Sequence, residues 1–155
     1  MEPTSLQERF FANGMCFGCG PKNDKGLRIR SFEDGDDGCI CRWTAQPHHL
    51  AFPGFLSGGI TGAILDCHSN WTAAWALMRA TGATTPPCTV TAEFSVKLRR
   101  PTPMTSELIL RSKVIETKAD RATIEAVLEA AGKTTATFHG VFAAVQEGHP
   151  AFHRW

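Results

Sequence analysis

The sequence has little net charge and no long apolar run. Its formal charge of +1 gives no whole-molecule field that would attract nucleic acid or a membrane surface. No apolar stretch reaches the roughly 18 residues that a membrane-spanning helix needs. Residues 1–5 lack the basic region and the following apolar region of a secretory signal. We therefore expect a cytoplasmic protein without a nucleic-acid or membrane partner.

Repeats, linkers and shifts in composition are also missing, which predicts one domain over residues 1–155. Hydrophobic residues make up 43% of the chain and charged residues 20%, as in an ordinary globular protein with a core. Glycine and proline interrupt residues 1–25, so we expect an irregular N-terminal segment with a short helix near residues 6–12. Residues 146–155 are expected to form a surface tail.

Disulfide bonds are not expected, although the chain has six cysteines, because no secretory signal accompanies them. Cys16 and Cys19 have the spacing of a metal-binding turn, but only one residue separates Cys39 from Cys41. Zinc ligands usually come in pairs separated by two to four residues, and this second pair lies in a predicted strand. We therefore expect reduced thiols that act as packing residues, with no metal and no cofactor. A small zinc protein is the alternative.

Periodicity predicts two strands, one long helix and then four strands. The helix carries an apolar stripe at three- and four-residue steps and would be about 36 Å long. A sheet that covers a single helix of this length has to curve around it, which leaves one sheet face and one edge open to a second copy. The predicted bounds are 57–80 for the helix, 47–53 for the loop before it, and 27–32, 39–43, 90–99, 108–116, 121–130 and 134–145 for the strands.

A glycine pair opens the predicted helix, and a carboxylate follows two turns further along. The first turn of a helix leaves its backbone N–H groups without partners, and the helix dipole adds positive charge there. Gly58 and Gly59 allow an oxygen to approach those groups, so residues 57–59 are expected to bind an oxygen that gains negative charge. Asp66 lies among apolar neighbours, where a carboxylate requires a partner or a cavity. It is either a base or nucleophile, or a structural aspartate satisfied by a nearby donor.

Three motifs occur in the same order as in a known family. They are Cys16-Phe17-Gly18-Cys19-Gly20-Pro21, then Ser57-Gly58-Gly59 with Asp66, and then Val90-Thr91 with Arg99-Arg100-Pro101. With the order of predicted elements, they resemble the hotdog-fold thioesterases, in particular the phenylacetate-pathway (PaaI-like) acyl-CoA thioesterases. The resemblance covers residues 16–145. It implies an α+β hotdog fold, in which a curved antiparallel sheet wraps around one long central helix.

The resemblance also implies a reaction and a role for each matching residue. The protein would hydrolyse an acyl-CoA to a free acid and CoA. The amide of Gly58, helped by Gly59, would bind the thioester oxygen, and Asp66 would activate water or attack the carbonyl itself. Thr91 would orient the water or the acid. In this fold each site is built by two subunits, so a homodimer or a tetramer is expected.

Two positions depart from the family pattern. Ser57 replaces the usual histidine before the glycines, and Ala51 replaces an asparagine found in many members. Ser57 is a good N-cap residue, so helix capping is the simpler interpretation of this change. Asn70 lies one turn beyond Asp66 and is expected to hydrogen-bond its carboxylate, either as an ordinary helical pair or as a substitute for the missing asparagine.

Positive charge gathers at Arg99 and Arg100. Arginine suits phosphate, so we expect contacts with the phosphates of CoA, although charge on a strand is usually only solvated. The predicted substrate-binding residues are therefore Ser57, Asn70, Arg99 and Arg100, and none of them is a metal ligand.

His68 lies on a different side of the predicted helix from Asp66 and is expected to be a packing or interface histidine. Two further functions stay open. A non-catalytic acyl-CoA or acyl-lipid binding protein would explain the missing family histidine and asparagine. A hotdog enoyl-CoA hydratase or dehydratase is the other, and it would need a catalytic histidine beside the acid.

Overall fold

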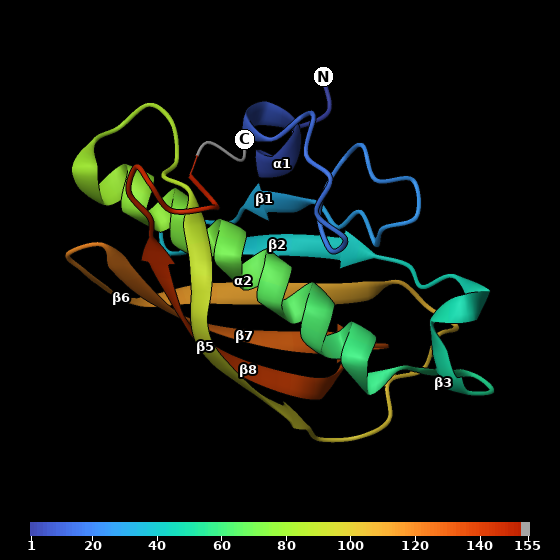
Figure 1. Ribbon diagram of the computed structural model, residues 1–155. Coiled ribbons are helices and arrows are strands. Elements are labelled where there is room, and N and C mark those ends of the chain that lie inside the picture. Colours follow the sequence, from blue (N-terminus) through green and yellow to red (C-terminus); the bar gives the residue numbers. More distant parts are fainter. Residues whose placement is uncertain (153–155) are drawn as a thin grey trace.

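The computed structural model describes residues 1–152, and within them one long helix packs against a six-stranded sheet (Figure 1). The helices are α1 (Leu6–Phe10) and α2 (Gly58–Thr81), and the sheet strands are β1 (Ser31–Glu33), β2 (Gly38–Trp43), β5 (Thr89–Leu98), β6 (Leu108–Lys118), β7 (Arg121–Ala130) and β8 (Lys133–Ala144). All neighbouring strands are antiparallel, in the order β1-β2-β6-β7-β8-β5. Figure 1 shows β6, β7 and β8 passing behind α2 and β5 crossing on its near side, so that the sheet curves around the helix. This confirms the predicted α+β hotdog fold with one long central helix.

Helix α2 buries the apolar stripe that its sequence predicts. Ile64, Leu65 and Trp71 are at most 1% exposed and belong to the main core. Burying side chains of this size contributes roughly 1.5–3 kcal/mol each, which favours a helix seated on the sheet. Gly82 ends the helix at a φ of 71°, and its amide donates to the Arg79 carbonyl at 3.2 Å. A glycine in the left-handed region is a common helix stop.

The strands after the helix match their predicted bounds closely. Tight turns join β6 to β7 at Ala119 and β7 to β8 at Ala131 and Gly132, and all three residues have positive φ. These turns set the antiparallel register of β6, β7 and β8. Strand β5 pairs with β8 through a bulge between Thr91 and Glu93, and it forms one edge of the sheet.

Two local predictions were wrong. Residues 27–32 were expected to be a strand, but β1 begins at Ser31, because Arg28 has a φ of 54° and turns the chain. Leu27 and Ile29 are nevertheless buried. The alternation of apolar and polar residues therefore identifies core residues here, although they do not lie in a strand. Residues 47–53 are not an irregular loop. They hold a 3-10 turn (Pro47–His49) and strand β3 (Leu50–Phe52), which pairs with β4 (Phe55–Leu56).

The N-terminal segment holds the expected short helix and packs against β1. Gln7 is buried and makes two hydrogen bonds with Ser31. Its Nε2 donates to the Ser31 hydroxyl at 3.0 Å, and its Oε1 accepts from the Ser31 amide at 2.8 Å. Across residues 1–152, no helix combines the length and the apolarity that crossing a lipid bilayer requires. Of the expected surface tail, residues 153–155 lie outside the described residues.

Candidate active site

The candidate acid lies on the side of α2 that faces the edge strand β5. Asp66 is half-buried, and the hydroxyl of Thr91 donates a hydrogen bond of 2.7 Å to its Oδ1. Thr91 directly precedes the β-bulge of β5, which re-aims the strand there. Thr91 thus lies beside the acid, at the position where the family resemblance implies a hydroxyl that orients the water or the acid. The threonine engages one carboxylate oxygen and so ties the acid to the edge strand.

One helical turn beyond Asp66, a second polar pair joins α2 to β5. Thr89 donates to Asn70 Oδ1 at 2.6 Å, and Asn70 Nδ2 donates to the Thr89 carbonyl at 3.4 Å. Two residues of strand cover roughly 6.6 Å and one turn of helix roughly 5.4 Å, so the two pairs form side by side. Asn70 is thus engaged with the strand, a partner that the sequence did not predict.

The first turn of α2 has backbone N–H groups to which the N-cap side chain offers no hydrogen bond. Ser57 occupies the N-cap position as predicted, but its side chain makes no capping hydrogen bond. Gly58 and Gly59 are exposed, and among the described residues no acceptor is found for their amides. With the helix dipole, these free N–H groups make a site that attracts a negatively charged oxygen.

A pocket of about 380 Å³ opens at this helix start and contains both predicted arginines. It is lined by Gly58, Thr61, Leu98, Arg99 and Arg100, together with residues of β3 and β4. The amides of Arg99 and Arg100 donate to the Thr135 carbonyl at 2.8 and 3.2 Å, which holds this segment against β8. Both arginine side chains are exposed, so the pocket combines a helix N-terminus with two cations.

Within one chain, the two halves of the predicted site are separated. Asp66 does not line the pocket at Gly58, and two turns of helix put the two residues roughly 12 Å apart along the axis. Ala51 lines the pocket in place of the family asparagine and offers no polar side chain. A single chain therefore brings together the glycine turn and the arginines, and separately the acid and Thr91.

His68 is a packing residue, as predicted. It is fully buried, with Nδ1 2.8 Å from Ser31 Oγ and Nε2 3.2 Å from the Cys39 carbonyl oxygen. A carbonyl only accepts, so Nε2 carries the proton. Burial lowers the pKa of His68 to about 4, which keeps the ring neutral at physiological pH.

The cysteines divide into two groups. Cys39 and Cys41 are buried in β2, and burial raises the pKa of each to about 12, as expected for inert packing thiols. Cys16 and Cys19 meet a third thiol, Cys67 of α2, which the sequence spacing did not suggest. These three sulfur atoms are the group in the described chain best suited to hold a metal ion.

No family model matches the chain, and no curated protein matches it. Many solved structures do. A thioesterase superfamily protein from Shewanella loihica is 30% identical, over 76% of this chain and 91% of that chain, with a TM-score of 0.65.

Two more distant structures show the fold alone. A further thioesterase superfamily protein is 20% identical over 92% of this chain and 70% of its own, with a TM-score of 0.68. A thioesterase from Haemophilus influenzae is 14% identical over 79% of this chain and 84% of its own, with a TM-score of 0.67. On its likeness to the Shewanella protein and on its hotdog fold, this chain belongs to the thioesterase superfamily.

Proposed function

We propose that the protein is an acyl-CoA thioesterase of the PaaI-like kind, which hydrolyses a thioester to a free acid and CoA. The observation that carries the proposal is the 2.7 Å hydrogen bond from Thr91 to Asp66. It positions a half-buried carboxylate at the edge of the sheet, in a chain where the Gly58 and Gly59 amides have no acceptor among residues 1–152. Membership of the thioesterase superfamily supports this class of reaction.

The two halves of the site would meet across a homodimer built on β5. In the described residues, β5 pairs with β8 on one side and with no strand on the other. It also exposes two large apolar side chains, Phe94 at 49% and Leu98 at 60%. An unpaired edge with apolar side chains is a natural place for a second strand to add. Two such dimers would make the tetramer.

A two-fold axis near the middle of β5 explains why this pairing would complete the site. An antiparallel pair centred on Ser95 sets Glu93 opposite the partner's Lys97, which matches opposite charges. It also sets the Thr91 end of one strand against the Leu98 end of the other. Leu98 lies against Gly58, and Thr91 lies against Asp66. The same axis therefore carries the acid of one chain to the glycine turn of its partner.

In the proposed mechanism, the thioester carbonyl oxygen binds the Gly58 amide, with the Gly59 amide beside it. Asp66 of the other chain either removes a proton from an attacking water or attacks the carbonyl carbon itself, and both routes give a tetrahedral oxyanion. The helix N-terminus stabilises that oxyanion. Collapse breaks the carbon–sulfur bond. On the water route, the proton that Asp66 removed passes to the leaving sulfur, and the free acid and CoA thiol are released together. On the direct route, the thiolate takes a proton from solvent and leaves an acyl-aspartate anhydride, which a water molecule then hydrolyses to the free acid and the Asp66 carboxylate. Thr91 holds one oxygen of Asp66 and so positions the carboxylate for this step.

The arginines of the pocket would bind CoA. Its diphosphate and 3′-phosphate are multiply charged, and the planar guanidinium groups of Arg99 and Arg100 pair with phosphate in a bidentate way. Ser57, the N-cap residue of α2, would stand at the position of the family histidine in this site. All six cysteines are free thiols, which fits the cytoplasmic location that we propose.

The second candidate function is an acyl-CoA binder without turnover. It is favoured by one observation, that Ser57 and Ala51 stand where relatives of the PaaI kind carry histidine and asparagine. A hydratase or dehydratase is less well supported, because His68 bonds Ser31 and the Cys39 carbonyl, away from the acid.

A thiol-release assay with short, aromatic and long acyl-CoAs tests the proposal. A thioesterase frees CoA from at least one of them, and Asp66→Asn loses that activity while the exposed control Glu116→Gln keeps it. Binding of acyl-CoA without thiol release would establish the binder instead. Loss of absorbance from an enoyl-CoA would favour the hydratase.

A further inference from the structure

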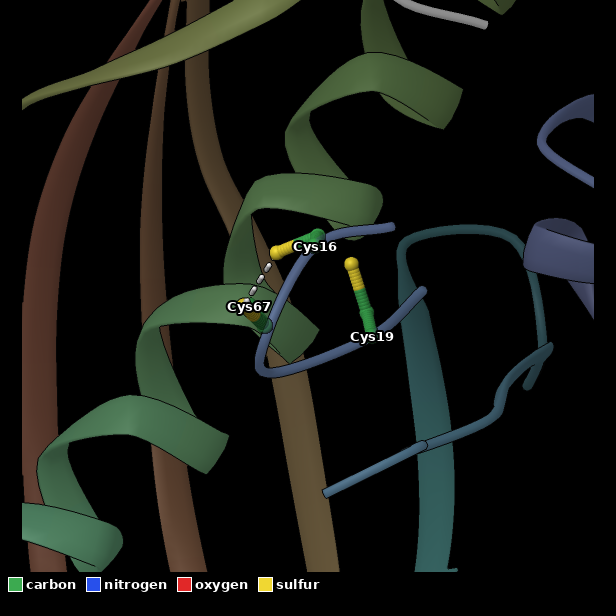
Figure 2. Close-up of side chains that lie close together, drawn as sticks. All are labelled: Cys16, Cys19 and Cys67. Atoms are coloured by element: carbon green, nitrogen blue, oxygen red, sulfur yellow. Dashed lines mark hydrogen bonds between the residues drawn. The ribbon is translucent and has the colours of Figure 1, made fainter. Parts of the chain in front are cut away.

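Three thiols from two distant parts of the sequence meet beside the middle of α2. Cys16 and Cys19 belong to the N-terminal loop and Cys67 to the helix, and Figure 2 shows their side chains gathered between the loop and the helix. All three sulfur atoms lie within 4.8 Å of one another. The cluster faces the loop, whereas Asp66, the preceding residue, faces β5.

The spacing of the sulfur atoms suits a metal ion. The Sγ atoms of Cys16 and Cys67 are 3.8 Å apart. Zinc–sulfur bonds of about 2.3 Å in a tetrahedron place neighbouring sulfur atoms about 3.8 Å apart. A disulfide needs about 2.05 Å, so the chain would have to move to form one. One pair is at the edge length of a zinc tetrahedron and all three sulfur atoms lie within 4.8 Å of one another, so the cluster needs little rearrangement to bind the ion.

The loop is shaped to bring its two sulfur atoms onto the helix. The Gly20 amide donates to the Cys16 carbonyl at 2.8 Å, which closes a tight turn around the pair. A Cβ at Gly18 would overlap the sulfur of Cys67, so the backbone of the turn rests directly on that atom. The Leu27 amide, in turn, donates to the Phe17 carbonyl at 2.7 Å and braces the turn from the other side.

Helix α2 also supplies a hydrogen bond to the cluster from outside it. The indole Nε1 of Trp71 donates to Cys19 Sγ at 3.3 Å. Donors of this kind orient metal ligands and stabilise a bound thiolate, as outer partners do in zinc sites.

We infer that Cys16, Cys19 and Cys67 form a three-thiolate zinc site that fastens the N-terminal loop to α2. Zinc replaces the thiol protons, which pass to solvent. Three protein ligands leave one tetrahedral position for a water molecule. Counting pairs along the sequence could not find this site, because the third ligand comes from the helix and not from Cys39 or Cys41. The inference is independent of the proposed reaction.

Metal content of the full chain, produced without a polyhistidine tag and kept reduced, tests the inference. We expect about one zinc per chain by elemental analysis, and Co²⁺ added to metal-free protein should give the intense absorption of thiolate-to-cobalt charge transfer. Cys67→Ala and, as the milder change at the half-exposed loop position, Cys16→Ser should lose both signals. Cys88→Ala, a buried thiol outside the cluster, is the matched control and should keep them.

Circular dichroism of each variant checks that the fold is retained. Reduced, folded protein that binds neither zinc nor cobalt would overturn the inference. So would a Cys16→Ser variant that binds zinc as tightly as the original chain, or a Cys16–Cys67 disulfide in protein that takes up no metal after reduction.

Discussion

Asp66 and Cys67 are neighbours on α2, yet they belong to two different environments. They lie about 100° apart around the helix. Asp66 faces the edge strand and accepts a hydroxyl hydrogen bond from Thr91 at 2.7 Å. Cys67 faces the N-terminal loop and meets two other thiols. One side of the helix carries a carboxylate beside the edge strand β5, and the other carries a thiol covered by the N-terminal loop.

This difference gives the two sides of one helical turn different expected roles, one in the reaction and the other in holding the N-terminal loop. Among residues 1–152, β5 has no strand on its outer edge, so under the proposed dimer a group on the strand side would reach a substrate bound by the partner. The loop side is closed, because the turn at Gly18 rests on Cys67. We therefore expect changes on the strand side to affect turnover, and changes on the loop side to affect metal content and stability.

The largest effect is expected from Asp66→Asn. The amide keeps the size of the side chain and can still accept from Thr91, but it neither removes a proton from water nor attacks a carbonyl. We expect kcat/KM for thioester hydrolysis to fall at least ~10²-fold, with zinc content and circular dichroism unchanged. Steady-state thiol release measures the fall, and an equal rate in the variant would remove Asp66 from the mechanism.

The glycine turn allows a matched pair of variants. Gly58 is the first residue of α2, where proline is well tolerated and removes only an N–H that the helix does not use. Gly58→Pro should therefore lower kcat about 10²-fold by deleting one oxyanion donor. Gly58→Ala keeps the donor and meets only the flexible end of Leu98 at 3.2 Å, so it should lose far less. Equal losses in both would argue against an oxyanion role.

Mixing these two variants tests whether the site is shared between chains. A heterodimer of Asp66→Asn with Gly58→Pro has one site with both defects and one site with neither. Random pairing then restores about a quarter of the original activity, because half of the dimers are mixed and each has one intact site of two. Coexpression followed by the thiol-release assay measures this. If acid and glycine turn act within one chain, mixing restores nothing.

A smaller effect is expected from Thr91→Ala. It removes a hydrogen bond to a charged group, which is worth about 1.5 kcal/mol, so turnover should fall roughly tenfold. Thr91→Ser keeps the hydroxyl and should regain most of the rate. The ratio of the alanine and serine variants isolates the hydrogen bond, and a serine variant as slow as alanine would assign the loss to packing of the bulged strand.

The strand side of this comparison could be predicted from the sequence, and the loop side could not. The glycine pair, Asp66 and Thr91 follow the motif order of the family that the sequence resembles, and that resemblance alone predicts that Thr91 orients the water or the acid. Asn70 was expected to pair along the helix with Asp66, but a bond to Thr89 depends on the register of β5, which no local pattern encodes. Cys67 joins Cys16 only through the tertiary path of the loop.

The smallest effect on turnover is expected from removing the metal, and it decides whether the two sides of α2 act separately. A strong chelator applied under reducing conditions should change kcat/KM less than about twofold, because the sulfur cluster and the acid lie on different faces of the helix. The loop loses its attachment to α2, so the thermal midpoint should fall by roughly 5 °C. Cys67→Ala should start at the lower midpoint and show no response to chelator. A chelated protein as inactive as Asp66→Asn would mean that the cluster positions the acid, and the two environments would then be parts of one site.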